Sequence, residues 1–218
     1  TPGWTHTLTT DEDGRATLTG IPLGTFTIYE SKAPEGYLPS DETWSYTVGA
    51  DQLGDMGVVE LESRVPDIPI AFDLEISKFK DYGKSNESGI EQPASGVVFE
   101  VVSNSSQQVV GTLTSNIYGF ASTKDLTKAW FGAGERPDGV HGAIPYARAG
   151  YTVREVADTV PEGFKQTGEW TITAEQIADG AELQYIVDNH ALSTHLQIVK
   201  RDAQTGSPVP LAGFTFQL

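Results

Sequence analysis

The sequence contains no cysteine, so no disulfide can stabilise the fold. An exported chain of 218 residues usually gains stability from disulfides. This chain is therefore either intracellular or exported by an organism that stabilises its surface domains in another way. The absence of cysteine also excludes a thiol nucleophile and a thioester within this piece. No Gly-x-Ser-x-Gly motif and no spaced histidine pair is present, so we expect no enzyme acting on an external substrate, no cofactor and no metal site.

Basic residues and long apolar runs are also scarce. Lys and Arg number 14 against 30 Asp and Glu, which gives a formal net charge of −16. Such a chain is repelled by phosphate backbones and anionic lipids, so we expect neither nucleic acid nor an anionic membrane surface as a partner. No stretch approaches the roughly 20 apolar residues of a membrane span, so we expect no membrane insertion in this segment. Both ends interrupt a pattern, and we expect any targeting or anchoring signal to lie outside this piece.

Short alternating runs of Thr, Val, Ile, Tyr and Phe dominate what is present, and Gly, Pro, Asp and Ser clusters separate them. Examples are the runs at 16–19, 25–29, 97–102 and 151–154. Only residues 174–178 hint at a helix, and they are too few for more than one turn. The pattern predicts an all-β fold.

Two repeated patterns interlock along the chain. The first is a strand that ends in Glu and is followed by Pro-Glu-Gly-aromatic and a Trp, at 26–44 and again at 151–170. The second is Leu-x-Ile-x-Lys followed by Pro, Gly and Phe, at 74–99 and again at 196–216. One unit therefore opens with the lysine strand and closes after the glutamate segment.

This order defines the domains. Residues 72–191 hold one complete unit, 1–66 are the C-terminal part of a preceding unit, and 192–218 are the opening strands of a third. Two prolines in 64–69 mark the junction, because proline interrupts central strands. The turn at 11–14 resembles a calcium loop only weakly, lacks the downstream acid, and is better explained as a tight hairpin turn.

The complete unit carries an insertion at 128–142 that the first unit lacks. It contains Trp130 and Phe131 beside Gly and Arg residues. Long loops on rigid β scaffolds often bind ligands, so one interpretation is a contact surface for a host protein or glycan. The other, which we favour, is a loop that folds its own aromatic residues onto the edge of the sandwich.

Strand parity points three polar side chains inward, because side chains alternate across a strand. Lys78 ends the apolar row of 74–78, Glu155 ends that of 151–155, and Asn189 ends that of 183–189. Taken alone, each of these residues would be explained as an ordinary polar residue at the end of a strand. A buried Lys relieves its desolvation by losing its proton, and burial favours the neutral acid of a Glu. A neutral amine, a carboxyl group and a carboxamide together can form an amide and expel ammonia.

The residues between Gly14 and Tyr37, and those between Lys200 and Phe214, resemble CnaB-type (SpaA-like, prealbumin-like) repeat domains of Gram-positive surface adhesins and pilins. The resemblance implies tandem immunoglobulin-like β-sandwiches in which the first and last strands are adjacent. It also implies an autocatalytic isopeptide bond between Lys78 and Asn189, assisted by Glu155. The parity argument reaches the same three positions independently.

Several positions leave alternatives open. Lys80 shares a face with Lys78 and is the alternative donor, whereas Asp188 faces outward by parity. In the first unit, Glu30 is present without its lysine strand. Its last strand, at 59–63, has Ser63 where parity requires Asn, and Asp67 is an acceptor candidate that lies past a proline. In the third unit, Lys200 is present without its partners.

The first and third units, each incomplete, together hold about one domain. We therefore expect strand exchange between chains, in which C-terminal strands of one chain complete the N-terminal unit of another. The expected function is a structural stalk or repeat segment of a Gram-positive cell-surface adhesin or pilin, with neighbouring repeats as partners. The expected location is extracellular, cell-wall anchored or in a pilus. The alternative is a host-ligand binding module that uses the 128–142 loop.

Overall fold

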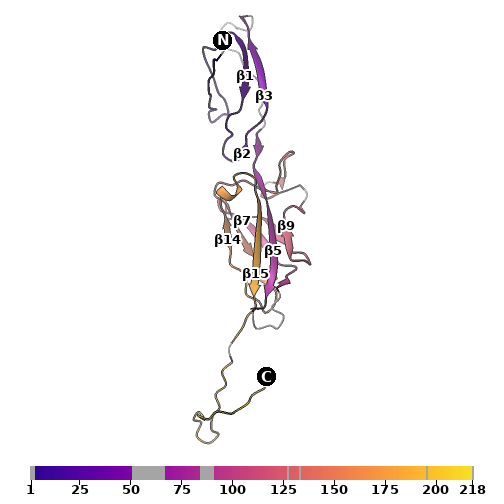
Figure 1. The fold of residues 1–218 in the computed structure, drawn as a ribbon, viewed down its shortest axis with the longest axis vertical. Helices are drawn as coiled ribbons and strands as arrows, with labels where there is room; N and C mark the ends of the chain where they lie inside the picture. Colours follow the sequence, from indigo (N-terminus) through magenta and orange to yellow (C-terminus); the bar gives the residue numbers. More distant parts are fainter. Residues whose placement is uncertain are drawn as a thin grey trace.

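The computed structural model describes residues 3–50, 67–83, 91–126, 128–132, 134–194 and 196–217. These form an elongated molecule with an N-terminal unit, a middle β-sandwich and a C-terminal segment, and the two termini lie at opposite ends (Figure 1). Apart from two short 3-10 turns, the regular structure of the described residues is β, which confirms the predicted fold class. None of the described helices is long and apolar enough to cross a membrane.

The described residues of the N-terminal unit contain few strands. They are β1 (Gly24–Tyr29), β2 (Tyr37–Leu38) and β3 (Thr43–Val48). The run at 16–19, which we expected to be a strand, is not one. Its counterpart in the middle unit, β9 (Phe120–Ser122), is a strand because it hydrogen-bonds to β5, and the described part of the N-terminal unit holds no strand equivalent to β5.

The middle unit contains most of the elements. In the first sheet they are β5 (Ala71–Asp81), β6 (Gln92–Pro93), β9, β12 (Ile144–Pro145) and β15 (Glu182–His190). In the second sheet they are β7 (Val98–Ser103), β8 (Val109–Thr114), β13 (Tyr151–Glu155) and β14 (Trp170–Ile172). The smaller elements are β4 (Ile68–Pro69), β10 (Ala129–Trp130), β11 (Gly134–Glu135), and the 3-10 turns η3 (Ala157–Thr159) and η4 (Glu175–Ile177).

Strand β5 is the centre of the first sheet. It pairs in parallel with β15 and in antiparallel with β6, β9 and β12. The expected adjacency of the first and last strands of the unit is therefore observed. The second sheet has the order β14-β13-β7-β8. The only helical turn expected from sequence, at 174–178, is the 3-10 turn η4.

The core lies between these two sheets. Leu74 and Ile76 from β5 and Phe99 and Val153 from the opposite sheet are fully buried. Strand alternation produces this layer, since residues of one parity on each strand face the other sheet. The third residue of the inward row on β5 is Lys78, which brings a charged group into the apolar layer.

Candidate functional site: a buried lysine, glutamate and asparagine

Lys78, Glu155 and Asn189 lie together inside the middle unit. Their exposed fractions are 0%, 2% and 0%. They come from β5, β13 and β15, so the two sheets of the sandwich both contribute. Chains bury a lysine only with a partner, because an unpaired ammonium in an apolar interior costs several kcal/mol.

Glu155 is placed between the other two side chains. Its Oε1 lies 3.1 Å from Lys78 Nζ. Its Oε2 accepts a hydrogen bond of 2.9 Å from Asn189 Nδ2. One carboxyl group thus contacts both the amine nitrogen and the amide nitrogen.

Thr167 is a fourth member of this site that sequence parity does not find. Its backbone N–H donates to Glu155 Oε2 at 2.8 Å and fixes the carboxyl group. Its hydroxyl accepts from Lys78 Nζ at 3.1 Å and donates to the Asp188 carbonyl at 2.6 Å. Thr167 lies in the loop between β13 and β14, where no periodicity marks a side chain as inward.

Asn189 is oriented by the same loop. Its Nδ2 also donates to the Lys165 carbonyl at 2.9 Å. Its Oδ1 is buried and has no hydrogen-bond partner among the described residues. A buried carbonyl oxygen without a hydrogen-bond partner is uncommon in folded proteins.

The surroundings of the amine are apolar and aromatic. Lys78 Nζ lies 5.9 Å from the centroid of the Phe99 ring, and Phe99 in turn packs edge-on against Trp170. This burial lowers the pKa of Lys78, against the opposing effect of Glu155. The lysine therefore loses its proton, and becomes a nucleophile, more readily than an exposed lysine.

Lys80 and Asp188, the two neighbouring residues that the sequence analysis considered, lie in different environments from Lys78 and Asn189. Lys80 is paired with Asn189 in the strand register, but its side chain is partly exposed, whereas Lys78 is fully buried at Glu155. Asp188 does not face fully outward as parity suggests: its Oδ1 is buried, and its charge partly opposes the lowering of the Lys78 pKa by burial.

The corresponding positions in the other units are not assembled in this way. Glu30 is only half-buried, and its Oε2 accepts a hydrogen bond of 2.6 Å from Ser40 N. Ser63 lies outside the described residues. Lys200 is exposed in the C-terminal segment, with its Nζ 5.5 Å from the Phe214 ring centroid. Residues 11–14 form a turn closed by a hydrogen bond of 3.1 Å from Gly14 N to the Asp11 carbonyl, but no strand flanks it, so the expected hairpin is not formed by the described residues.

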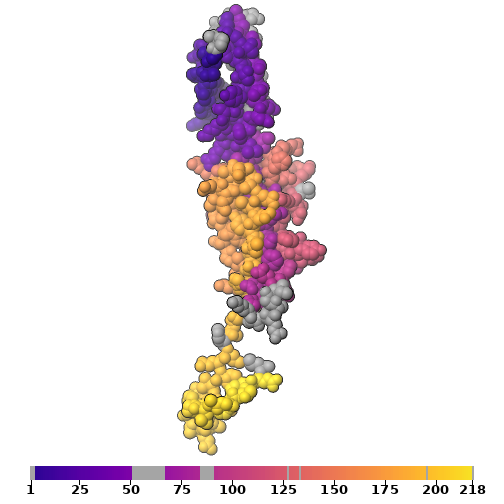
Figure 2. All heavy atoms as spheres, in the orientation of Figure 1, coloured from indigo at the N-terminus to yellow at the C-terminus, as the bar shows by residue number. Residues whose placement is uncertain are grey.

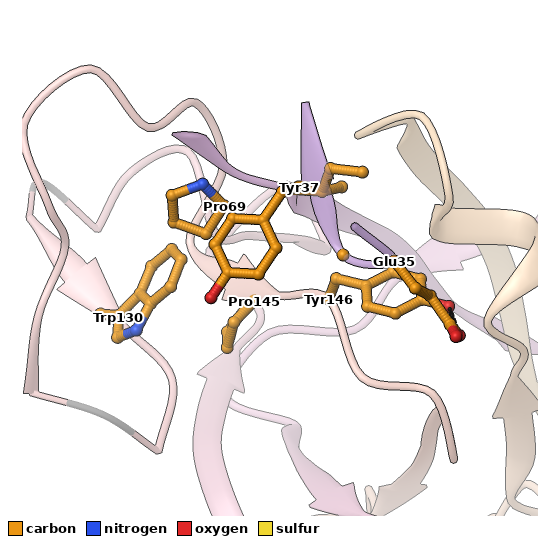
Figure 3. Close-up of a pocket in the computed structure, with 8 residues that line it drawn as sticks. Glu35, Tyr37, Pro69, Trp130, Pro145 and Tyr146 are labelled. Atoms are coloured by element: carbon orange, nitrogen blue, oxygen red, sulfur yellow. Dashed lines mark hydrogen bonds between the residues drawn. The ribbon is translucent and has the colours of Figure 1, made fainter. Parts of the chain in front are cut away.

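A second feature lies where the N-terminal unit meets the middle unit. Tyr146 donates a hydrogen bond of 2.7 Å from its hydroxyl to Glu35, and strand β2 pairs with β4. Beside this contact is a cavity of about 260 Å³, which Tyr37, Trp130 and Pro145 also line (Figure 3). The cavity is therefore shared by the loop after β1, the junction and the insertion.

The two aromatic residues of the insertion have different environments. Phe131 is buried in the core, where its ring packs against Gly111. Trp130 is half-buried and lines the junction cavity. The favoured interpretation of the insertion, in which its aromatic residues fold down onto the sandwich, matches this placement of Phe131.

Comparison with known proteins bears on part of the chain. Residues 4–61 match the family model described as SpaA, prealbumin-like fold domain. This match confirms the resemblance to SpaA-like domains that the sequence predicts. No curated protein matches the sequence.

Two solved structures align with a larger part of the chain. The Bacillus anthracis TIE protein is 21% identical with a TM-score of 0.58, over 85% of this chain and 28% of that one. The minor pilin GBS52 of Streptococcus agalactiae is 14% identical with a TM-score of 0.42, over 88% of this chain and 71% of that one. This chain thus spans little more than a quarter of the TIE protein, and the likeness to that protein shows a shared fold.

Proposed function

We propose that this chain is a structural repeat segment of a Gram-positive cell-surface stalk, in an adhesin or a pilus, whose middle unit is sealed by an amide bond between Lys78 and Asn189. The class follows the SpaA-type domain at 4–61. An extracellular location, cell-wall anchored or in a pilus, and neighbouring repeats or subunits as partners belong to the same proposal.

One observation supports the bond above all others: a single carboxyl group contacts both the attacking and the leaving nitrogen. Glu155 Oε1 lies 3.1 Å from Lys78 Nζ, and Oε2 lies 2.9 Å from Asn189 Nδ2. Such a group can take a proton from one nitrogen and give it to the other without moving.

The step balances without any co-reactant. The neutral amine of Lys78 attacks Cγ of Asn189, and a C–N bond forms. Glu155 accepts a proton from Lys78 Nζ and delivers it to Asn189 Nδ2. The Cγ–Nδ2 bond then breaks, and one ammonia leaves. The lowered pKa of Lys78 supplies the neutral amine, and the dry aromatic surroundings favour the neutral species.

The mechanical consequence follows from the strand order. Lys78 is on the first strand of the unit and Asn189 is near the end of the last, and these strands run parallel. A pull on both ends of the unit passes along β5 into the bond and out at the end of β15. The loop of roughly 110 residues between them is relieved of force. On a chain-entropy model, closing such a loop stabilises the fold by about 4–5 kcal/mol, the role that a disulfide has elsewhere.

Intact mass of the purified chain tests the bond. We expect the chain to be lighter than its sequence by one ammonia, and a Lys78 peptide to be joined to an Asn189 peptide. Lys78→Met, Glu155→Ala and Asn189→Ala should each restore the full mass. Lys80→Met is the matched control and should still lose ammonia. A wild-type chain of full mass, or a loss that depends on Lys80, would refute the assignment.

Binding of a host protein or glycan through the 128–142 loop stays a second prediction. The half-buried Trp130 at the junction cavity is the observation that favours it. Trp130→Ala should then abolish adhesion to host cells while the ammonia loss remains. Unchanged adhesion would remove the loop from the binding surface.

A further inference from the structure

The amide nitrogen of Asn189 has more acceptors around it than it has hydrogens. Its Nδ2 lies 2.9 Å from Glu155 Oε2, 2.9 Å from the Lys165 carbonyl and 3.4 Å from Thr167 Oγ1. A carboxamide nitrogen carries two hydrogens, so one of these three oxygens is left with only a long contact. Ammonia carries three hydrogens. The three oxygens therefore match the nitrogen that leaves better than the nitrogen that is attacked.

The hydroxyl of Thr167 is oriented as an acceptor toward the site. Its hydrogen is used in a bond of 2.6 Å to the Asp188 carbonyl. A hydroxyl has one hydrogen and two lone pairs, so both lone pairs of Oγ1 remain for the reacting groups. One of them accepts from Lys78 Nζ at 3.1 Å, and the other faces Asn189 Nδ2. Thr167 therefore contacts the attacking and the leaving nitrogen at once.

The same contacts assign a role to each hydrogen of the attacking amine. A neutral lysine has two N–H hydrogens and one lone pair, and Lys78 Nζ lies 3.1 Å from both Glu155 Oε1 and Thr167 Oγ1. The hydrogen on the Glu155 side is the one that the carboxyl group takes and passes on. The hydrogen on the Thr167 side stays as the N–H of the new amide. With both hydrogens engaged, the lone pair is left for the attack.

The loop that supplies two of the three oxygens is tied to both of the strands that carry Glu155 and Asn189. Lys165 N donates to the His190 carbonyl at 2.8 Å, next to Asn189 on β15. Gln166 Nε2 donates to the Glu155 carbonyl at 2.6 Å, at the end of β13. The acceptors are thus held in place relative to the reacting groups, so they need no reorganisation during the reaction.

A nitrogen released at this place has a short way to solvent. Strand β15 ends at the side of the middle unit that faces the C-terminal segment (Figures 1 and 2). In the loop, Lys165, Gln166 and Gly168 are exposed, and Thr167 between them is half-buried. Asn189 itself is 0% exposed. The loop therefore forms the boundary between the buried amide and water, and ammonia can leave past it.

The three oxygens also disfavour an acid in place of the amide at position 189. A protonated aspartate has one O–H, and an ionised aspartate has none. An oxygen at the place of Nδ2 would therefore face at least two of the three acceptors with no hydrogen between them. A site built to accept N–H groups rejects an analogue that lacks them, because its own polar atoms are then left unpaired.

We propose that Glu155 Oε2, the Lys165 carbonyl and the Thr167 hydroxyl form a binding pocket for the departing ammonia, and that this pocket makes the reaction specific for an asparagine acceptor. The inference rests on the bond between Lys78 and Asn189 proposed above. The ammonia takes the electron pair of the Cγ–Nδ2 bond, keeps the two hydrogens of Nδ2 and gains the one that Glu155 carries over from Lys78. Each of its three N–H groups then meets one oxygen of the pocket.

The rate of ammonia loss tests the hydroxyl. The whole chain is synthesised in a short cell-free pulse, and intact mass is measured at increasing times. Thr167→Val keeps the size of the side chain and the backbone N–H to Glu155 but removes the hydroxyl, and it should slow the loss about 10–100-fold. Thr167→Ser keeps the hydroxyl and should restore the wild-type rate. Thr152→Val removes a half-buried hydroxyl that bonds to Asn104 instead, and this matched control should react like wild type.

An acid at position 189 tests the specificity. Asn189→Asp should lose water at least about 100-fold more slowly than the wild type loses ammonia, because the pocket then faces an oxygen. Thr167→Val removes one of the acceptors that repel this oxygen, so it should slow the aspartate chain less than it slows the asparagine chain. A threonine that only held Lys78 and Glu155 in place would slow both chains by the same factor.

The outcomes separate the pocket from the bond. Equal rates for asparagine and aspartate at position 189 would overturn the specificity. A Thr167→Val chain as fast as wild type, or a Thr167→Ser chain as slow as Thr167→Val, would overturn the part of the hydroxyl. In each of these cases the wild-type chain still loses ammonia, so the bond between Lys78 and Asn189 stands. A wild-type chain that keeps its full mass would refute the bond itself, and the pocket with it.

Discussion

The middle unit and the N-terminal unit contain the same glutamate segment but differ in what covers it. In the middle unit, Tyr151, Val153 and Glu155 are at most 3% exposed. In the N-terminal unit, the equivalent Phe26 and Glu30 are half-buried, and Ile28 is exposed. The local sequence therefore forms a strand in both units, β1 and β13, but only β13 is buried against an opposite sheet.

This difference sets the size of each expected effect. A charged group inside the middle unit has no access to water, so its removal leaves an uncompensated partner. The same residue type in the N-terminal unit is solvated, and its removal changes little. Substitutions at equivalent positions therefore measure how far the two units differ in the burial of these side chains.

The largest contrast is expected for the two glutamates. In an Asn189→Ala background, where no cross-link can form, Glu155→Ala leaves Lys78 buried without its carboxylate and should cost about 3–5 kcal/mol. Glu30→Ala removes one half-buried hydrogen bond and should cost less than about 1.5 kcal/mol. Hydrogen exchange of the β5 and β1 peptides in increasing urea measures each unit separately.

Lys78→Met in the same background is the control for this contrast. Lys78→Met removes the buried charge that Glu155 compensates. Adding it to Glu155→Ala should therefore recover most of the stability that Glu155→Ala alone loses. Equal losses at Glu155 and Glu30 would mean that the N-terminal unit is as well packed as the middle one.

A smaller contrast is expected for the two glycines that lie at the start of β1 and just before β13. Gly150 has a φ of +70°, and a Cβ there would overlap the Ile172 carbonyl oxygen of the neighbouring strand. Gly24 has a φ of +150° but nothing within 4 Å of its Cβ position. Gly150→Ala should cost about 2–4 kcal/mol, and Gly24→Ala only the 1–2 kcal/mol of its backbone conformation. Calorimetric unfolding of the two variants measures both losses of stability. A larger loss for Gly24→Ala than for Gly150→Ala would contradict this prediction.

Sequence reasoning finds the residues whose position follows from strand period and misses those held by loops. Lys78, Glu155 and Asn189 each end an inward row, so parity places them in the core. Thr167 is fixed by a hydrogen bond to Glu155, and no pattern in the sequence predicts that contact. In the first unit, strand parity points to Ser63, which lies outside the described residues, whereas the hydrogen bond from Ile70 N to the Gly36 carbonyl fixes the chain just after the alternative candidate Asp67.

The pH dependence of stability tests whether Lys78 is desolvated in the folded chain. Burial lowers the pKa of Lys78 below its ordinary value of 10.5, so between these two pKa values the unfolded chain binds more protons than the folded one. In the Asn189→Ala variant, stability should therefore rise with pH through the window below 10.5 and be lost as pH falls. Urea unfolding at several pH values, compared with Asn189→Ala/Lys78→Met, isolates this residue. Identical slopes in both variants would show that Lys78 is not desolvated.

The smallest effect is expected at the contact that joins the two units. Tyr146 donates to Glu35 at 2.7 Å, and the Arg148 guanidinium lies 3.7 Å from the same carboxylate, but Glu35 and Arg148 are exposed and Tyr146 is only half-buried. Tyr146→Phe and Glu35→Gln should therefore each cost about 0.5–1.5 kcal/mol of docking free energy.

Their double-mutant cycle in hydrogen exchange of the β2 peptide should show coupling, because both substitutions remove the same bond. Arg154→Gln, which loses an exposed ion pair with Glu100 inside the middle unit, is the matched control and should show no coupling to Glu35. Additive effects of Tyr146 and Glu35 would mean that β2 and β4 alone hold the joint. The contact between the N-terminal unit and the middle unit would then depend on the backbone hydrogen bonds between β2 and β4.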